Sequence, residues 1–181
     1  MASSETLAAA ARLLAGSTAD AAAVISSAFR AGGRVYLCGN GGSASDAQHV
    51  AAELAGRLRK DRQGLPAIAL TVNSSVLTAI ANDYGYDAVF ARQVQALGRP
   101  GDVLVGISTS GTSPNVVAAL AEAHALGLST IGLMGKAGGP MKVHCDIAIL
   151  VPSSDTQRIQ EAHIAVGHAI CELVERDLFG G

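Results

Sequence analysis

The chain has 181 residues, a formal net charge of −2 and 49% hydrophobic residues. This length and apolar content predict a single domain over residues 1–181 with a sizeable hydrophobic core. The small charge, without any basic cluster, argues against a nucleic-acid partner. No apolar run reaches the length of a membrane-spanning helix, so no membrane partner is expected.

The cysteines indicate a reducing compartment. Cys38, Cys145 and Cys171 are odd in number, far apart and not arranged as CxxC. This favours reduced thiols over a disulfide framework. The N-terminal segment MASSETLAAAARLLAGS lacks the positively charged start of a signal peptide. We therefore expect a cytoplasmic protein.

Short apolar runs alternate with segments of helical periodicity along the chain. Strands are expected at 35–38, 66–72, 102–107, 129–134 and 146–151. Helices are expected at 4–30 with an interruption near 16–18, and at 44–58, 75–82, 87–97, 115–126 and 156–178. This alternation predicts a three-layer α/β fold with a doubly wound parallel sheet. The expected strand order is the flavodoxin-like 2-1-3-4-5, with an added N-terminal helical segment at about 4–30.

The first candidate site begins where the apolar run 35–38 ends. The glycine-rich turn 39–43 follows it, and Ser43 is expected to be the N-cap of the helix over 44–58. A helix that starts directly after a strand presents free backbone N–H groups and the positive end of its dipole. This arrangement suits a phosphate group.

A second loop, at 108–113, has the same relation to the strand before it and the helix after it. Its hydroxyl groups belong to Ser108, Thr109, Ser110 and Ser113. Hydroxyls and helix N-terminal amides are neutral donors, suited to a phosphate monoester that must be released again. In the order 2-1-3-4-5, both loops lie at the switch point of the sheet, where ligands bind.

Titratable groups lie on the outward faces of two helices. His49 and Glu53, four residues apart, project away from the apolar stripe of their own helix. On the last helix His168 lies opposite the apolar stripe, flanked by Gln160 and Glu161. Each group alone favours a solvated surface, but together they could form a metal site or an acid–base pair. For these faces to meet they must be covered, most simply by a neighbouring subunit, which predicts an interfacial active site.

The remaining polar residues of these helices are interpreted as structural or superficial. His163 and Gln48 fall on or near core-facing positions, so we expect structural roles. His124 and His144 fall in a helix and a loop without an evident partner, so we expect surface positions.

Four motifs in fixed order resemble a known family. They are CGNGGSASDAQH, AIANDYGYD, GISTSGTS and RIQEAHIAVGH. The chain resembles the sugar isomerase (SIS) family over roughly residues 34–178 and is most similar to its phosphoheptose isomerases. The resemblance implies interconversion of sedoheptulose 7-phosphate and D-glycero-D-manno-heptose 7-phosphate, toward the heptose of bacterial surface polysaccharides. It also implies a cytoplasmic homotetramer with one Zn²⁺ per subunit and active sites between subunits.

The resemblance assigns roles residue by residue. The implied zinc ligands are His49, Glu53, Gln160 and His168, and the implied acid–base pair is Glu53 and His168. The implied substrate contacts are Asn40, Gly41, Gly42, Ser43, Glu53, Asn82, Asp83, Ser108, Thr109, Ser110, Ser113 and Gln160. A carboxylate and an imidazole suit proton transfer through an enediol, and zinc suits stabilisation of its negative charge. Glu53 cannot be a tight zinc ligand and a free base at the same moment, so either the metal moves or one role is secondary.

Two alternatives remain at this stage. The first is a non-catalytic SIS adaptor of the kind that associates with the replication initiator DnaA; that group lacks the Glu and the final His that stand here at Glu53 and His168. The second is an isomerase of another sugar phosphate, because phosphate loops do not read the length of the sugar chain.

Overall fold

The computed structural model describes residues 2–180, which form five strands in a single parallel sheet. The strands are β1 Val35–Gly39, β2 Ala67–Ala69, β3 Val103–Ser108, β4 Ser129–Gly135 and β5 Ile147–Val151. Their order is β2-β1-β3-β4-β5, and every neighbouring pair is parallel. The predicted doubly wound sheet and its strand order are confirmed.

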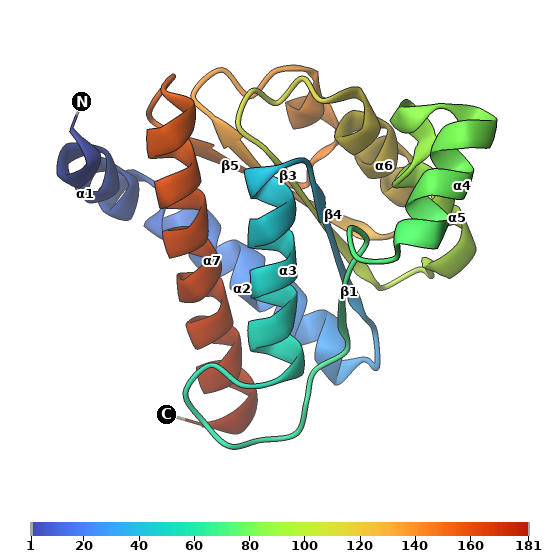
Figure 1. The fold of residues 1–181 in the computed structure, drawn as a ribbon. Coiled ribbons are helices and arrows are strands. Elements are labelled where there is room, and N and C mark those ends of the chain that lie inside the picture. Colours follow the sequence, from blue (N-terminus) through green and yellow to red (C-terminus); the bar gives the residue numbers. More distant parts are fainter. Residues whose placement is uncertain (1, 181) are drawn as a thin grey trace.

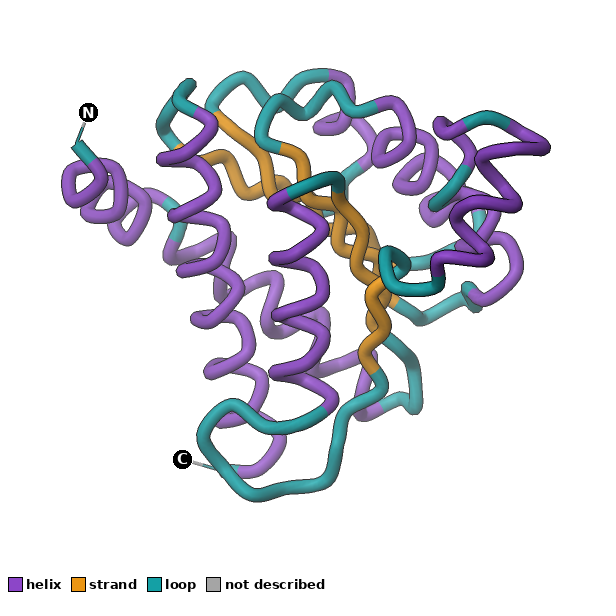
Figure 2. The backbone as a smooth tube through the Cα atoms, in the orientation of Figure 1, coloured by secondary structure: helices purple, strands orange, loops and turns teal. Residues whose placement is uncertain are grey.

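Helices cover both faces of the sheet (Figures 1 and 2). One face carries α2 Ala15–Arg30, α3 Gly42–Ala55 and α7 Thr156–Phe179, and α1 Ser3–Leu13 packs against α7. The other face carries α4 Ser74–Tyr84, α5 Ala91–Leu97 and α6 Pro114–Ala125, with the 3₁₀ turns η1 Tyr86–Ala88 and η2 Pro140–His144. The fold therefore has three layers, with the N-terminal helices added to the α7 side.

Two hydrophobic cores explain why the strands read as continuous apolar runs. Side chains alternate along a strand, so Val35 and Leu37 of β1 enter the core beneath α2, α3 and α7. Tyr36 and Cys38 enter the core beneath α5 and α6. A parallel sheet buried on both faces needs apolar residues at every position, which removes the period of two from the sequence.

The sheet register brings the two phosphate-type loops together. Gly39 at the end of β1 pairs with Ile107 near the end of β3, so the segments that follow emerge side by side. A Cβ atom on Gly39 would lie 2.7 Å from the carbonyl oxygen of Ser43 and 2.9 Å from that of Ile107. Glycine at position 39 thus allows the chain to leave the strand against its neighbour.

Several predicted boundaries differ from the structure. The break in the N-terminal helices falls at Leu14 rather than near 16–18. The helix α3 begins at Gly42, one residue before the Ser43 expected as its N-cap; the cap position is Gly41, with φ 55°. Ser43 is buried inside the first turn. The region 87–97 splits into η1 and α5, and the strand expected over 66–72 shortens to β2.

The three cysteines are free, as expected. Burial raises the pKa of each thiol to about 12. Within residues 2–180, no single helix is long and apolar enough to cross a membrane; α1 and α2 meet the criterion only as a pair bent by 63°.

The structural role expected for His163 is consistent with its position, whereas that for Gln48 is wrong. His163 on α7 is 1% exposed, and neither ring nitrogen makes a hydrogen bond of normal geometry within the described residues. Burial lowers its pKa to about 4, an effect that the nearby Met134 backbone only partly offsets. Gln48 is exposed, and its amide donates to the hydroxyl of Thr71.

The neutral buried His163 should make the free energy of unfolding depend on pH. Its folded pKa lies below the ordinary value of 6.5, so the unfolded chain takes up a proton first as pH falls. Stability is therefore lost between pH 6.5 and about 4, by up to about 3 kcal/mol. In His163→Leu this part of the pH dependence should disappear, as measured by urea unfolding at pH 7 and pH 4.5. In His124→Gln, which alters an exposed imidazole, it should persist; an unchanged slope in His163→Leu would contradict the assignment.

Candidate active site

Three of the predicted site residues form a compact cluster. The Nε2 atoms of His49 and His168 lie 2.8 Å apart, and His49 Nε2 lies 3.4 Å from a carboxylate oxygen of Glu53. One potential ligand atom from each residue lies within 4.8 Å of the others. The His49 side chain is 46% exposed and that of Glu53 is 21% exposed. The cluster, called the His-Glu-His cluster below, is therefore open to solvent and to ligands.

Two helices that lie side by side create this cluster (Figure 1). His49 and Glu53 stand one turn apart on α3, and His168 stands on the neighbouring α7. At the seam the helices approach closely, since a Cβ atom on Gly167 would lie 2.7 Å from a methyl carbon of Val50. His49, Glu53 and His168 already converge within one chain. The expected cover by a neighbouring subunit, which would make the active site interfacial, stays a prediction.

Gln160 lies two turns before His168 on α7, against the first loop. A Cβ atom on Gly42 would lie 2.5 Å from its amide nitrogen. Gly42 is thus a position where a missing side chain leaves room for the Gln160 amide. Along α7, the Gln160 amide therefore lies at the first loop, and His168 of the His-Glu-His cluster lies two turns further on.

The first loop is held by an amide pair that sequence reasoning did not identify. Asn40 and Asn115 exchange two hydrogen bonds, of 2.8 and 2.9 Å, which tie the loop after β1 to the first turn of α6. The hydroxyl of Tyr86 also donates to Asn40. Asn40 thus has a structural partner on either side, and Asn115 and Tyr86 join the predicted set of residues around the loop. Their positions in an N-terminal helical turn and in η1 gave no sequence signal.

The second loop presents a chain of hydroxyl groups. The Ser108 hydroxyl lies 2.9 Å from that of Ser113, and the Ser110 hydroxyl lies 2.8 Å from that of Thr112. The Ser110 hydroxyl also accepts from the backbone N–H of Thr112 at 3.2 Å. A hydroxyl hydrogen can rotate, so these groups can turn toward an incoming acceptor. Gly111, with φ 67°, lets this loop lie directly on the Gly138 backbone.

A hollow of about 490 Å³ opens beside the second loop. Its lining residues are Thr109, Ser110, Gly135, Lys136, Ala137, Ser153, Ser154, Thr156 and Ile159. The lining supplies several hydroxyls and one cation, and no carboxylate among the described residues, which suits an anionic or polyhydroxylated ligand. Lys136 follows β4 at the same edge of the sheet as both loops, a position from which it could have been predicted.

The structure does not place Asn82 and Asp83 with the His-Glu-His cluster. Both are exposed near the end of α4, on the opposite face of the sheet from α3 and α7 (Figure 1). The Asn82 amide donates to the Asp83 carboxylate at 2.8 Å.

Among the other histidines, His124 is exposed as predicted, but it has a partner in Asp146 at 3.9 Å. His144 is partly exposed at the end of η2.

Asp46 is an acidic group near the cluster that sequence reasoning missed. It stands on α3 one turn before His49, and one of its carboxylate oxygens is buried without a hydrogen-bond partner in the described part of the chain. Burial raises its pKa, and the nearby His49 partly offsets this effect. The spacing of three residues from His49 is the signal that could have identified it.

Comparison with known proteins places the chain among sugar-phosphate isomerases. Residues 2–135 match the model of the SIS domain family. The phosphoheptose isomerase of Roseiflexus sp. (strain RS-1) is 60% identical over 151 residues, which are 83% of this chain and 77% of that protein. Two solved structures are also similar, those of the phosphoheptose isomerases from Neisseria gonorrhoeae and Francisella tularensis. They share 45% and 38% identity and have TM-scores of 0.91 and 0.93. Each alignment covers 96% of this chain, and 92% and 93% of those chains.

The family model spans both loops together with His49 and Glu53, and the structural alignments cover nearly all of the chain. The chain belongs to the SIS-domain family and, within it, to the phosphoheptose isomerases.

Proposed function

We propose that this chain is an aldose–ketose isomerase that converts sedoheptulose 7-phosphate to D-glycero-D-manno-heptose 7-phosphate, for the heptose of bacterial surface polysaccharides. The observation that carries the proposal is the His-Glu-His cluster, which lies in a chain 60% identical to a phosphoheptose isomerase. A binding protein needs the phosphate loops but has no need of clustered acid–base groups.

The reaction moves a proton from C1 of the ketose to C2, through an enediol. Glu53 is the base that takes the proton from C1 and returns it at C2. His168 exchanges protons with the two oxygens, so that the C2 carbonyl becomes a hydroxyl while the C1 hydroxyl becomes a carbonyl. A carboxylate and an imidazole have the basicity that these transfers need near neutral pH.

Phosphate binding is assigned to the two loops at the switch point. The N-terminus of α6, a helix of 12 residues, follows the hydroxyl-rich second loop and adds backbone N–H groups and the positive end of its dipole. The first loop contributes Asn40, Gly41, Gly42 and Ser43 in the same way, although the burial of Ser43 leaves its backbone better placed than its hydroxyl. Substrate contacts by Asn82 and Asp83 require approach from the α4 side.

The donor set of the His-Glu-His cluster fits zinc. Two imidazole nitrogens and a carboxylate oxygen within 4.8 Å are ligands that Zn²⁺ accepts, and Gln160 is the fourth proposed ligand. When bound, the metal supplies positive charge that stabilises the anionic form of the enediol. His49 and His168 would hold it through the nitrogens that face each other, so Glu53 and His168 are both proposed to take part in metal binding and in proton transfer.

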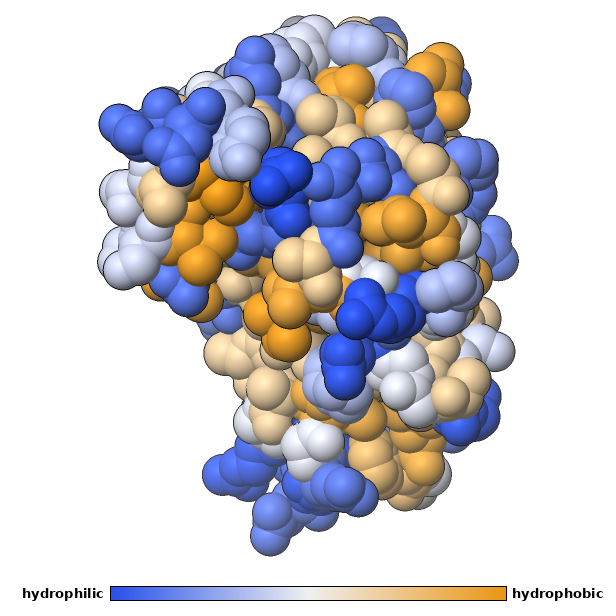
Figure 3. Space-filling model, turned by 90° about the vertical axis from the view of Figure 1, so that its right-hand side faces the viewer, coloured by the Kyte–Doolittle hydropathy of each residue, from blue (hydrophilic) through white to orange (hydrophobic). Residues whose placement is uncertain are grey.

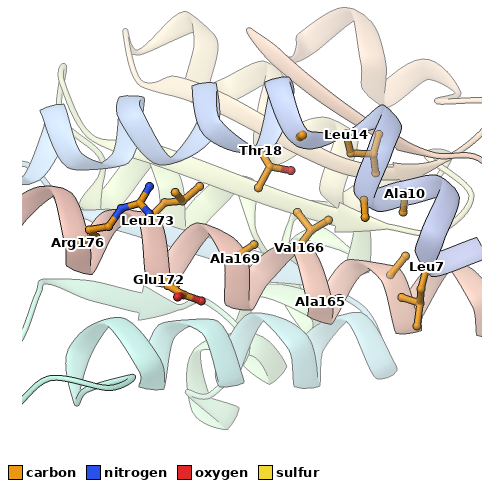
Figure 4. A pocket seen from close by; sticks show the side chains of 13 residues that line it. Leu7, Ala10, Leu14, Thr18, Ala165, Val166, Ala169, Glu172, Leu173 and Arg176 are labelled. Atoms are coloured by element: carbon orange, nitrogen blue, oxygen red, sulfur yellow. The ribbon is translucent and has the colours of Figure 1, made fainter. Parts of the chain in front are cut away.

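We also propose a homo-oligomer, in line with the tetramer with interfacial active sites that the family resemblance implies. An apolar groove of about 610 Å³ runs between α1, α2 and α7 (Figure 4). It is lined by Leu7, Ala10, Leu14, Thr18, Ala165, Val166 and Leu173, among others. Apolar patches also lie among polar side chains on the α4–α5 side of the molecule (Figure 3), where Ile68, Val72 and Leu97 are exposed. Apolar surface on two sides favours contacts with further copies of the chain.

The proposed assembly is cytoplasmic, and each subunit is a single SIS domain over residues 1–181. In the described part of the chain, both helical layers pack on the same sheet, and α1 packs on α7. This arrangement supports one domain.

Turnover tests the reaction directly. Purified protein with added Zn²⁺ should convert sedoheptulose 7-phosphate to the aldoheptose phosphate, and chelation should abolish the conversion. Glu53→Gln and His168→Gln should each lower kcat by about 10²- to 10⁴-fold, because each removes an acid–base group. The matched variant Glu122→Gln, on α6, should retain full activity. No conversion by folded, zinc-loaded protein would instead favour an adaptor or another sugar phosphate.

The second loop is tested by Ser110→Ala. Loss of a hydroxyl that donates to a charged phosphate costs about 1.5–3 kcal/mol, so KM should rise at least tenfold while kcat changes little. Ser129→Ala removes a hydroxyl at the other end of the sheet, at the start of β4, and should leave KM unchanged. An unaltered KM in Ser110→Ala would show that this hydroxyl does not contact the phosphate.

Zinc binding is tested without substrate. Titration of metal-free protein with Zn²⁺, followed by calorimetry and thermal unfolding, should show binding and a rise in the unfolding midpoint. His49→Gln should weaken the binding at least tenfold, because it removes a ligand nitrogen, whereas His124→Gln on the exposed end of α6 should bind as the wild type does. Equal affinity in both variants would place the metal elsewhere.

A further inference from the structure

A buried ion pair joins the loop after α3 to the last helix. Arg62 Nε lies 3.2 Å from a carboxylate oxygen of Glu175, and their side chains are only 3% and 4% exposed. The loop over 56–66 passes beneath the C-terminal ends of α3 and α7 before it enters β2 (Figures 1 and 2). Buried charges require complete hydrogen bonding, so the partners of each side chain show what the pair holds.

Glu175 gathers the loop onto α7. Its carboxylate accepts hydrogen bonds from the backbone N–H groups of Leu58, Arg59 and Lys60, at 2.9–3.3 Å. Burial opposes ionisation of this carboxyl, but the three N–H donors and the Arg62 guanidinium outweigh it and hold its pKa below the usual range. The loop is therefore fastened to α7 by an ionised, fully partnered carboxylate.

Arg62 in turn fastens the end of α3. Its terminal nitrogens donate to the carbonyl oxygen of Glu53 at 2.9 Å and to that of Leu54 at 2.7 Å. They also donate to the carbonyl of Gly56, directly after the helix, at 3.1 Å. Carbonyls in the last turn of a helix lack partners within the helix and attract positive charge. One guanidinium thus caps α3 at the residue whose side chain belongs to the His-Glu-His cluster.

The Arg62–Glu175 pair, called the clamp below, connects the two helices that carry the His-Glu-His cluster: Arg62 bonds to the end of α3, and Glu175 belongs to α7. Glu175 follows His168 by seven residues on α7, which places both on one face of the helix, roughly 10 Å apart along its axis. Apolar packing alone lets neighbouring helices slide by small amounts, whereas a hydrogen-bonded guanidinium fixes them. We propose that the Arg62–Glu175 pair is a positioning device that sets α3 against α7 and thereby holds Glu53 and His49 at working distance from His168. The proposal rests on the proposed function, since it gives the pair a task in that reaction.

The chain offers a matched control for this pair. Arg59, in the same loop, pairs with Glu172, one turn earlier on α7, at 3.2 Å, but these side chains are 72% and 49% exposed. Arg62→Met and Arg59→Met each break one ion pair between the same two elements. Only the first uncouples α3 from α7, because within the described residues the Arg62 side chain bonds to carbonyls of α3, whereas the Arg59 side chain does not.

The experiment compares zinc affinity and kinetics of these variants at a temperature where both are folded. In Arg62→Met the affinity for Zn²⁺ and kcat should each fall at least tenfold, as expected when a group that orients ligands is lost, while KM stays within twofold. In Arg59→Met all three quantities should stay within twofold, because exposed pairs contribute little. Unchanged zinc affinity and kcat in Arg62→Met, with only a lower unfolding midpoint, would overturn the proposal.

Two further measurements keep the test decisive. If Arg62→Met does not fold, Arg62→Lys keeps the charge but loses the planar fork, and the same losses in zinc affinity and kcat are expected. Zinc affinity needs no substrate, so a wild type that binds zinc without turnover would refute the proposed reaction and still test the clamp. If the wild type neither turns over the substrate nor binds zinc, the readout becomes hydrogen exchange of the backbone amides at 50–55 in place of zinc affinity. Faster exchange is expected in the Arg62 variant alone, and equal exchange in both variants would refute the clamp.

Discussion

The contact between α3 and α7 is the constraint on which the site depends. Each helix packs on the sheet through its own apolar stripe, and the rims that face each other carry His49, Glu53 and His168. Gly167 lets the helices approach at the seam, and the Arg62–Glu175 pair ties their C-terminal ends together. The positions of the exposed polar side chains on the two helices thus depend on buried contacts between the same helices.

The sheet supplies the other half of the site. Because β1 and β3 are parallel neighbours, the loops that follow them emerge side by side, and the amide pair of Asn40 and Asn115 ties the first loop to the first turn of α6. The hydroxyls of Ser108, Ser110 and Ser113 then line the rim beside the N-terminus of α6. Neutral donors at one end and titratable groups at the other match a substrate with a phosphate at one end and a carbonyl at the other.

The differences between expectation and structure have local physical causes. Ser43 favours an N-cap by its residue type, but Gly41 takes the cap position with a positive φ, so the helix starts two residues earlier than expected. Gln48 fell near the apolar stripe of α3 by periodicity, yet its amide donates to Thr71 at an exposed position, because the stripe of α3 is narrower than the periodicity suggested. Periodicity locates the buried face of a helix only to within one residue on either side. For a polar residue at the edge of that face, such as Gln48, it therefore does not determine whether the side chain is buried.

The amino-acid sequence by itself determined the fold class, the strand order, the two loops and the identity of the titratable residues. It could do so because strand and helix periodicities are local and because parallel strand order follows from the rules of chain connection. Tertiary structure alone decided that His49, Glu53 and His168 meet within one chain, that Asn82 and Asp83 lie across the sheet, and that Arg62 reaches Glu175. The contacts of His49 with His168 and of Arg62 with Glu175 join residues more than a hundred positions apart, and their distances depend on how two helices pack, which no local pattern records.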